Sequence, residues 1–557
     1  MGLFSRKPKA PKPVNASANG AAGGGNDSAS VNSEGSNIRS SSTTGHSRIQ
    51  IHSINRTSAG SVPQTPLTPM TPHPHAMSRV NLPKPPDPSL DAAGYLRSLG
   101  SVRERSKIVT DKALRNALNH FDVDMAKFPD VVSFVCGIIK RDFDPPFLSI
   151  PPHGRYQHFC VGGRDRVANL LATFPDDVDS TEKCRRLIDL FLVSVLLDAG
   201  AGTSWSFKSA ENGRVYRRSE GLAIASLEMF KAGLFSGNPT NKFQVDKDGL
   251  RKLTVEQLEK GMQSRPGNEI AGLEGRAQLL IRLGGALASK TDFFGDDGRP
   301  GNMIDYLLAH PTTQASSTPI VVLPVLWNVL MSGLAPIWPS SRTAIDGISL
   351  GDAWPCTSMP QPKPATSPSS PPNFSPFPNS SSQSHSSGGG NAAPWESILP
   401  FHKLTQWLAY SLMHPMQSLL RIQFAGTELL TGLPEYRNGG LFIDLGVLTL
   451  KHDDLERGLQ NYNDYGRRTG VKGVEVAPMF EPSDDVVVEW RGVTVGFLDK
   501  LLVEVNKALK RELNGGELSL AQLLEAGSWK GGREIAEVSR PNTKEPPILI
   551  DSDGTVF

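Results

Sequence analysis

The stretches KCRRLIDLFLVSVLL (183–197) and SEGLAIASLEMFKAGL (219–234) decide the fold class of this chain. The first ends in a largely apolar run from Leu190 to Leu197, which is long enough for a buried helix. The second spaces its apolar residues as a helix does behind Ser219 and Glu220. A serine suits the N-cap position, and an acid in the first turn suits the helix dipole. Both stretches therefore predict helices, and we expect a mainly α protein.

Helical patterns recur through most of the remaining sequence, whereas strand signals are few. Further helices are predicted over 101–120, 254–263, 275–289, 401–413, 416–430 and 493–512. Pro415 should separate the two helices that flank it. Strands are predicted over 441–448, 486–490 and 548–550. The uncharged segment 311–341 contains several prolines, so it predicts a short buried helix from Pro324 to about Met331 and no membrane span.

Two segments have compositions that cannot supply a hydrophobic core. Residues 1–88 contain nine Lys or Arg, three Asp or Glu and one aromatic residue in a background of Ser, Gly, Asn and Pro. Residues 356–395 contain one charged residue, Lys363, among many Ser and Pro. We therefore expect a disordered N-terminal tail (1–88), a disordered Ser/Pro-rich insertion (356–395), and one body built from 89–355 and 396–557. Its size fits one large core or two lobes.

Charge and motif content exclude several classes of function. The chain of 557 residues has a net charge of +2, and outside the basic tail it is slightly acidic, so a nucleic-acid-binding surface is not expected. Its four cysteines form no C-x-x-C pair, which favours a reducing, cytoplasmic compartment. No histidine pair has metal-binding helical spacing, and no phosphate-binding loop is present. We predict neither a metal nor a cofactor.

Five clusters combine glycine, tryptophan, arginine and carboxylates, the ingredients of a small-molecule pocket. They are DAGAG (198–202) with Trp205 and RRSEG (217–221), LGDAW (350–354), PFHKLTQW (400–407), LTGLPEYRNGGL (430–441) ending near Asp444, and EAGSWKGGRE (525–534). Purely structural explanations remain open for three of these clusters: a glycine C-cap beside a core tryptophan for the first, a salt-bridged turn for the fourth, and a helix–turn–helix for the fifth. The fourth cluster is the strongest candidate, because it crowds four polar side chains against a Gly-Gly turn.

Taken in this order, the clusters resemble the uracil catabolism protein 4 family of fungi and bacteria, a family otherwise known as a domain of unknown function. The matching strings include DAGAGTSW (198–205), RRSEGLAIAS (217–226), PFHKLTQWLAYSL (400–412), LTGLPEYRNGGLFID (430–444) and GSWKGGREIA (527–536). The resemblance covers roughly residues 90–557 apart from the insertion, which directly follows LGDAW. It implies a role in a pyrimidine-degradation route in which uracil becomes a nucleotide and its ring is then opened.

This role leads to a specific mechanistic hypothesis, hydrolysis of the N-glycosidic bond of a ring-opened uridine nucleotide to urea and a sugar phosphate. Such a reaction needs a carboxylate to activate water, cations on the phosphate and aromatic walls for the planar urea. The catalytic candidates are Glu435, Asp444, Asp198 and Asp352. The substrate-binding candidates are Trp205, Arg218, Glu220, Lys403, Trp407, Tyr436, Arg437, Asn438, Trp529 and Arg533. Two alternatives stay open: a non-catalytic partner that binds the nucleotide intermediate, and a metal-independent C–N amidohydrolase.

The tail contains three Thr-Pro dipeptides, at Thr65, Thr68 and Thr71. Such sites are typical substrates of a proline-directed kinase, and phosphorylation would reverse the local positive charge. The expected partners are therefore a small nucleotide-derived molecule and such a kinase, with neither nucleic acid nor membrane.

Overall fold

Helices dominate the computed structural model, which confirms the predicted fold class. The structure describes residues 80–202, 204–362, 392–470 and 476–551, all within one unit of the chain, residues 66–557. The helices up to residue 309 are α2 (Ala92–Leu96), α3 (Leu99–Ala113), α4 (Phe128–Asp142), α5 (Arg155–Phe159), α6 (Arg166–Leu171), α7 (Ser180–Leu196), α8 (Arg218–Lys231), α9 (Lys247–Arg251), α10 (Val255–Gly261), α11 (Leu273–Ser289), α12 (Thr291–Phe294) and α13 (Met303–Ala309). Those that follow are α14 (Leu323–Gly333), α15 (Lys403–Leu420), α16 (Tyr436–Asp444), α17 (His452–Thr469), α18 (Asp485–Ala508), α19 (Leu520–Leu523) and α20 (Trp529–Ser539).

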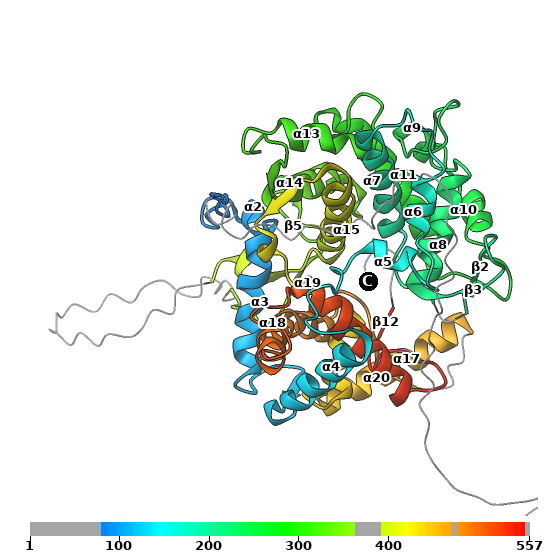
Figure 1. Ribbon diagram of the computed structural model, residues 1–557. Coiled ribbons are helices and arrows are strands. Elements are labelled where there is room, and N and C mark those ends of the chain that lie inside the picture. Colours follow the sequence, from blue (N-terminus) through cyan, green and yellow to red (C-terminus); the bar gives the residue numbers. More distant parts are fainter. Residues whose placement is uncertain (1–79, 203, 363–391, 471–475, 552–557) are drawn as a thin grey trace, which may run out of the picture. The chain divides into compact units, whose positions relative to one another are not determined.

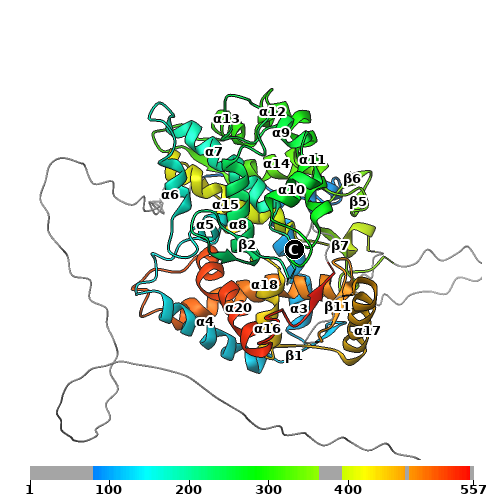
Figure 2. The same cartoon turned by 90° about the vertical axis from the view of Figure 1, so that its right-hand side faces the viewer.

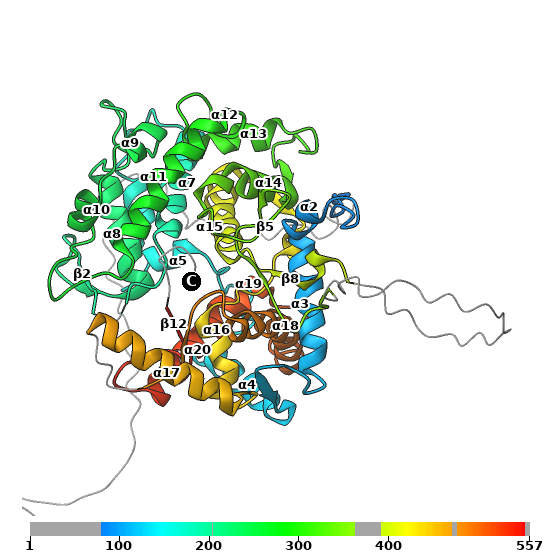
Figure 3. The ribbon, with the colours of Figure 1, turned by 180° about the vertical axis from the view of Figure 1, so that it is seen from behind.

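The longest helices form two groups that meet at the centre of the body. In Figures 1, 2 and 3, α7, α8, α11, α14 and α15 lie in one group, and α3, α4, α16, α17, α18 and α20 lie in the other. Within the first group α7 packs on α15 and α8, and within the second α18 packs on α3 and α16 on α20. The short helix α5 lies between the groups, where it contacts α7, α8 and α15.

The strands are short and pair two by two, so they fasten loops without forming a layer. Antiparallel pairs join β1 (Phe121–Val123) to β10 (Leu448–Leu450), β2 (Phe207–Lys208) to β3 (Val215–Tyr216), β5 (Ala344–Ile345) to β6 (Ile348–Ser349), and β7 (Ala353–Pro355) to β8 (Ile398–Pro400). Parallel pairs join β4 (Ile320–Val322) to β9 (Gln423–Ala425), and β11 (Met479–Phe480) to β12 (Leu549–Ile550).

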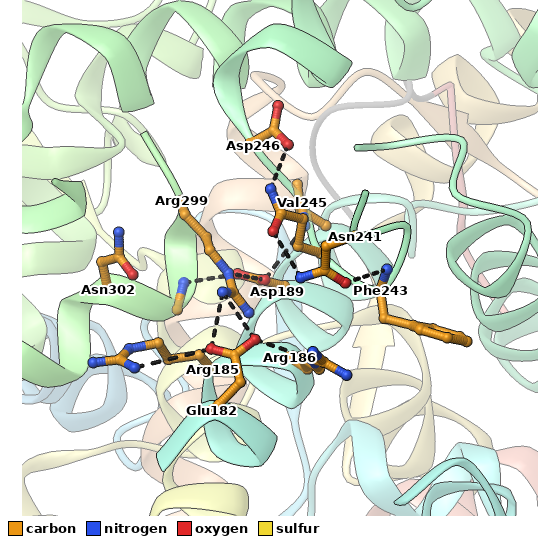
Figure 4. Close-up of polar contacts among 12 residues, drawn as sticks. Glu182, Arg185, Arg186, Asp189, Asn241, Phe243, Val245, Asp246, Arg299 and Asn302 are labelled. Carbon is orange, nitrogen blue, oxygen red and sulfur yellow. Dashed lines mark hydrogen bonds and ion pairs between the residues drawn. The ribbon is translucent and has the colours of Figure 1, made fainter. Parts of the chain in front are cut away.

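A buried polar network fixes α7 within the first group (Figure 4). Asp189, which is fully buried on α7, accepts hydrogen bonds from Arg299 Nε at 2.6 Å and from the Gly301 amide at 2.7 Å. Burial raises the pKa of Asp189 to about 6, and the Arg299 guanidinium opposes this rise. Arg299 also reaches Glu182 at the start of the helix. The network therefore holds α7 at its first turn and at its middle, and leaves its C-terminal end available to the site described below.

Several predicted elements are confirmed and others are wrong. Helices occur where 183–197, 219–234, 254–263, 275–289 and the segment after Pro324 predicted them, and β12 occurs at 548–550. Pro415 does not end a helix: α15 runs through it to Leu420, because most of α15 is buried and its packing outweighs the lost hydrogen bond. Residues 486–490 lie in α18, and 441–444 end α16. A short apolar run fits a buried helix as well as a strand, so local pattern misassigned both.

Two smaller corrections concern boundaries. Helix α8 begins one residue before Ser219, and its N-cap is Arg217. The body continues beyond residue 355, since Cys356, Ser358 and Met359 are buried in it. The predicted disorder of the tail and of the insertion falls mainly on 1–79 and 363–391, which lie outside the described residues, as do Thr65, Thr68 and Thr71. Within the described ranges, no helix has the length and apolar character needed to span a bilayer.

Candidate active site

A cavity of about 540 Å³ lies where the two helix groups meet. Its wall comes from α5, the loop after α7, the first turns of α8, α15 and α16, the start of α20, and the segment 542–551. Of the residues predicted from sequence, eight line this cavity: Asp198, Arg218, Lys403, Trp407, Glu435, Tyr436, Arg437 and Trp529. Residues that are up to 331 positions apart in the chain thus share one wall.

Asp198 lines the cavity, and one of its two carboxylate oxygens has no partner among the described residues. It follows the last turn of α7, and its side chain is about nine-tenths buried. Oδ2 accepts a hydrogen bond from Arg155 Nη1 at 3.1 Å, whereas Oδ1 is buried and has no hydrogen-bond partner among the described residues. A buried carboxylate oxygen without a donor is costly, because it has lost water and gained nothing in return. Such an atom marks a place where a ligand or an activated water is expected.

Two buried arginines hold the loop that carries Asp198. Arg276 on α11 is fully buried and donates to the carbonyls of Leu197, Ala199 and Gly200. Arg155 on α5 is also fully buried and binds Ser194 through Nε at 2.8 Å, and it binds Asp198 and His158 through Nη1. The carboxylate is therefore fixed on a rigid frame before any ligand arrives, which is the usual requirement for a catalytic group.

Glu435 also lines the cavity, but its two oxygens are engaged. Oε2 accepts from the Arg437 amide at 3.0 Å and Oε1 from the Asn438 amide at 2.6 Å, so the side chain caps the N-terminus of α16. Each oxygen is thus committed to satisfying an otherwise unpaired helical N–H group. This arrangement favours a structural and electrostatic role for Glu435 over the activation of water.

Three cations face the same space. Burial lowers the pKa of Lys403, and the nearby carboxylates of Glu435 and Asp198 oppose that effect. Arg437 lies over the Trp529 ring, with its guanidinium carbon 5.3 Å from the ring centre. Within the described ranges, no carboxylate forms an ion pair with Lys403 or Arg437. Arg218, at a left-handed φ of 53°, donates to the carbonyls of Thr543 and Lys544. Together these groups favour an anionic ligand such as a phosphate.

Aromatic rings line the cavity beside these cations. His153 lies 4.6 Å from Trp407 and 5.9 Å from Trp529, measured between ring centres, and His158 lies 5.7 and 5.5 Å from the same two rings. The Nε1 donor of Trp407 is buried without a partner among the described residues. A flat polar group with an acceptor atom would stack against the cavity face of this ring cluster.

The segment 540–551 closes the remaining side of the cavity. Arg540 forms a two-pronged ion pair with Asp444, and its Nε binds the Glu545 carbonyl at 2.5 Å. Downstream, β12 pairs with β11, and Asp551 binds Arg468 at 2.7 Å. Contacts at both ends of the segment thus hold it against the rest of the wall.

Six predicted residues lie outside the cavity wall. Asp352 is buried in an ion pair with Arg491 at 2.7 Å and accepts the Lys403 amide at 2.9 Å, so it supports the start of α15. Asp444 is held by Arg540, and Arg533 pairs with Glu220. The Trp205 indole is buried and donates to the Met262 carbonyl. The side-chain amide of Asn438 donates to the Leu433 carbonyl.

Sequence reasoning missed Arg155, His153, His158, Arg276 and the segment 542–551. Among these missed residues, the only sequence signal is the spacing of Arg155 and His158, which are three positions apart and therefore share one helical face. His153 was not predictable, since its partner Glu525 is 372 positions away. Among the described residues, no group of three or more His, Cys, Asp or Glu side chains could hold a metal ion.

Comparisons with known proteins show which family the chain is similar to. The profile of a family described as "Protein of unknown function (DUF1688)" matches residues 95–557. The chain is 42% identical over 468 residues to "Uracil catabolism protein 4" of Lachancea kluyveri, which covers 83% of this chain and 98% of the relative. It is 43% identical over 470 residues to "Protein urg3" of Schizosaccharomyces pombe, which covers 84% and 100%. The family match spans every residue of the cavity wall.

Proposed function

The chain belongs to the DUF1688 family, and from that premise we propose that it acts in uracil catabolism as a hydrolase of N-glycosidic bonds. Its substrate in this proposal is a ribosylurea phosphate, the ring-opened form of a uridine nucleotide, and its products are urea and ribose phosphate. The observation that carries the proposal is the unpartnered carboxylate oxygen Oδ1 of Asp198, a residue that lines a cavity together with cations and aromatic rings.

Asp198 is the proposed base. Water held by Oδ1 would attack the anomeric carbon as the bond to the ureido nitrogen lengthens, and the same negative charge would stabilise an oxocarbenium-like transition state. Arg155 fixes the carboxylate through Oδ2 and so leaves Oδ1 directed at the reacting water. Glu435 is proposed as the helix cap whose carboxylate also opposes the lowering of the Lys403 pKa by burial.

The two ends of the substrate match two kinds of group in the cavity wall, cations and aromatic rings. Lys403, Arg437 and Arg218 would bind the phosphate, because the first two are cationic groups without a paired carboxylate. Trp407 and Trp529 would enclose the planar urea, with the Trp407 Nε1–H donating to its carbonyl oxygen. The cavity volume of about 540 Å³ is ample for a nucleotide fragment of this size.

The test uses the purified full chain and ribosylurea 5-phosphate, with urea and ribose 5-phosphate both measured. Asp198→Asn should lower kcat by at least about 100-fold, the usual contribution of a positioned base. Asp305→Asn makes the same substitution at an exposed aspartate outside the cavity and should leave kcat unchanged.

Glu435→Gln should lose less activity than Asp198→Asn, because each Glu435 oxygen is already occupied by a helix amide. Binding without turnover by the wild-type chain would contradict the hydrolase and favour a binding partner of another enzyme. Release of ammonia or of a ribosylamine phosphate, without urea, would indicate an amidohydrolase instead.

A further inference from the structure

The two histidines of the aromatic wall have oppositely charged partners on Nδ1. His158 Nδ1 lies 2.9 Å from Arg155 Nη1, and His153 Nδ1 lies 2.6 Å from Glu525 Oε2. Both rings are buried, both line the cavity, and both lie against Trp407 and Trp529. Their surroundings therefore differ chiefly in the sign of one neighbour, and that sign decides what each ring can do with a proton.

His158 is fixed as a neutral hydrogen-bond donor. A guanidinium has only donors, so Nδ1 must accept from Arg155, and the ring proton must be on Nε2. Burial and the Arg155 charge hold the pKa of His158 well below its usual value. This ring can donate a hydrogen bond to a substrate oxygen, but it cannot deliver a proton and be restored as a cation.

His153 has the opposite arrangement. A carboxylate only accepts, so Nδ1 of His153 donates to Glu525, which leaves Nε2 able to hold or release a proton. The backbone is anchored as well, because the His153 amide donates to the Ala521 carbonyl at 2.9 Å. Glu525 lies in a single π-helical turn, Leu524–Ser528, a local distortion that is often found at functional sites.

We propose that His153, oriented by Glu525, is the general acid that protonates the leaving ureido nitrogen. This inference rests on the proposed function and extends it to a residue that the sequence did not indicate. A ureido anion is a poor leaving group, so the C1′–N bond cannot break readily unless its nitrogen gains a proton. His153 is a cavity residue that combines an exchangeable ring proton with a carboxylate able to stabilise the charged ring.

The C1′–N electron pair moves to nitrogen, which takes the proton from His153 Nε2 and leaves as neutral urea. Water forms the new C1′–O bond and gives its proton to Asp198. Ribosylurea phosphate and water thus become ribose phosphate and urea, and the proton on Asp198 returns through solvent to His153. The other charged groups that line the cavity are Asp198, Arg218, Lys403, Glu435, Arg437, Arg540, Lys544, Glu545 and Asp551.

Two substrates separate this role from a structural one. Ribosylurea 5-phosphate needs a protonated leaving group, whereas 4-nitrophenyl ribofuranoside 5-phosphate releases a stable anion without one. His153→Gln in the full chain should lose at least about 100-fold in kcat on the first substrate and less than about fivefold on the second. His452→Gln, an exposed histidine outside the cavity, serves as the matched control. Turnover of the nitrophenyl substrate also shows that the variant is folded.

A pH profile provides the second readout. In the wild-type chain, kcat on ribosylurea phosphate should fall on the alkaline side, as for any reaction that needs a protonated acid. Glu525→Gln removes the charge that stabilises protonated His153, so this alkaline limb should move to lower pH. Asp198→Asn should instead lower kcat on both substrates.

The failures are distinguishable. If the wild-type chain cleaves neither substrate, the proposed function itself is wrong. If it cleaves both, but His153→Gln loses equal activity on both or retains activity on ribosylurea phosphate, the hydrolase stands and the acid assignment is overturned. If Glu525→Gln leaves the alkaline limb of the pH profile unchanged, the assignment of His153 as the acid is also overturned.

Discussion

At the scale of single residues, Arg155 connects more of the site than any candidate that the sequence indicated. Its guanidinium reaches Ser194 at the end of α7, His158 on its own helix and the carboxylate of Asp198. It is fully buried, and burial lowers its pKa while Asp198 opposes that effect. A buried charge of this kind is tolerated only because each of its neighbours accepts a hydrogen bond or an ion pair.

Arg155→Met should therefore lower the free energy of unfolding by about 3 kcal/mol, since it leaves the Asp198 carboxylate buried without its partner. Urea denaturation followed by tryptophan fluorescence measures this change. Arg214→Met, at an exposed position, should change stability by less than about 0.5 kcal/mol. Equal stability of the two variants would mean that the Arg155–Asp198 pair contributes nothing to the fold.

At the scale of elements, Gly532 shows why α16 and α20 can lie in close contact beside the cavity. A Cβ at Gly532 would overlap the backbone carbonyl of Arg437, so only glycine lets α20 approach α16 this closely. This contact places Trp529 beneath the Arg437 guanidinium. Gly285, in the middle of α11, has no atom within 4 Å of the corresponding position.

The same substitution should have opposite effects at these two positions. Gly532→Ala should destabilise the protein by at least about 2 kcal/mol, because the helices must separate, and should weaken phosphate binding through Arg437. Gly285→Ala should stabilise it by about 0.5–1 kcal/mol, because alanine favours an unobstructed helix. Thermal unfolding of both variants is the measurement, and a gain in Tm for Gly532→Ala would contradict the close packing.

The elements also show how far local sequence could predict this protein. Amphipathic and apolar patterns located α7, α8, α11 and α14, because those signals are local. The glycine-rich clusters located Asp198, Glu435 and Arg437, since turns that bring backbone close to a ligand require particular residues. Roles such as those of His153 and Arg276 come from partners distant in sequence, and no spacing within the chain reveals such a partner.

At the scale of the whole molecule, His120 joins parts of the chain that are far apart in sequence. Its Nδ1 lies 2.8 Å from Asp454 on α17, and its Nε2 lies 2.7 Å from Asp485 on α18. Partial burial lowers the pKa of His120, but hydrogen bonds to the two carboxylates outweigh this effect and raise it to about 9. Glu489 also faces it and accepts its backbone amide. The charged ring thus links the start of β1 to two helices.

This cluster predicts a pH dependence of stability. The folded-state pKa of about 9 exceeds the ordinary value of 6.5, so the stabilisation is complete below pH 6.5 and is lost as pH rises through 9. His120→Gln should lower the free energy of unfolding at pH 6 and flatten its slope between pH 6.5 and 9. His310→Gln, on a partly exposed histidine that bonds Thr312, should leave the slope as it is. Chemical denaturation at several pH values tests this, and an unchanged slope in His120→Gln would contradict it.

The position of the segment 540–551 has a consequence for how the protein is made. The ribosome synthesises it after every other part of the cavity wall, so a nascent chain carries Asp198, Lys403 and Arg437 in an open trough until this segment emerges. A translation product that stops before Arg540 would contain most of the helical body but could not enclose a ligand. Ligand-induced protection from proteases would then distinguish chains that contain this segment from chains that stop before it.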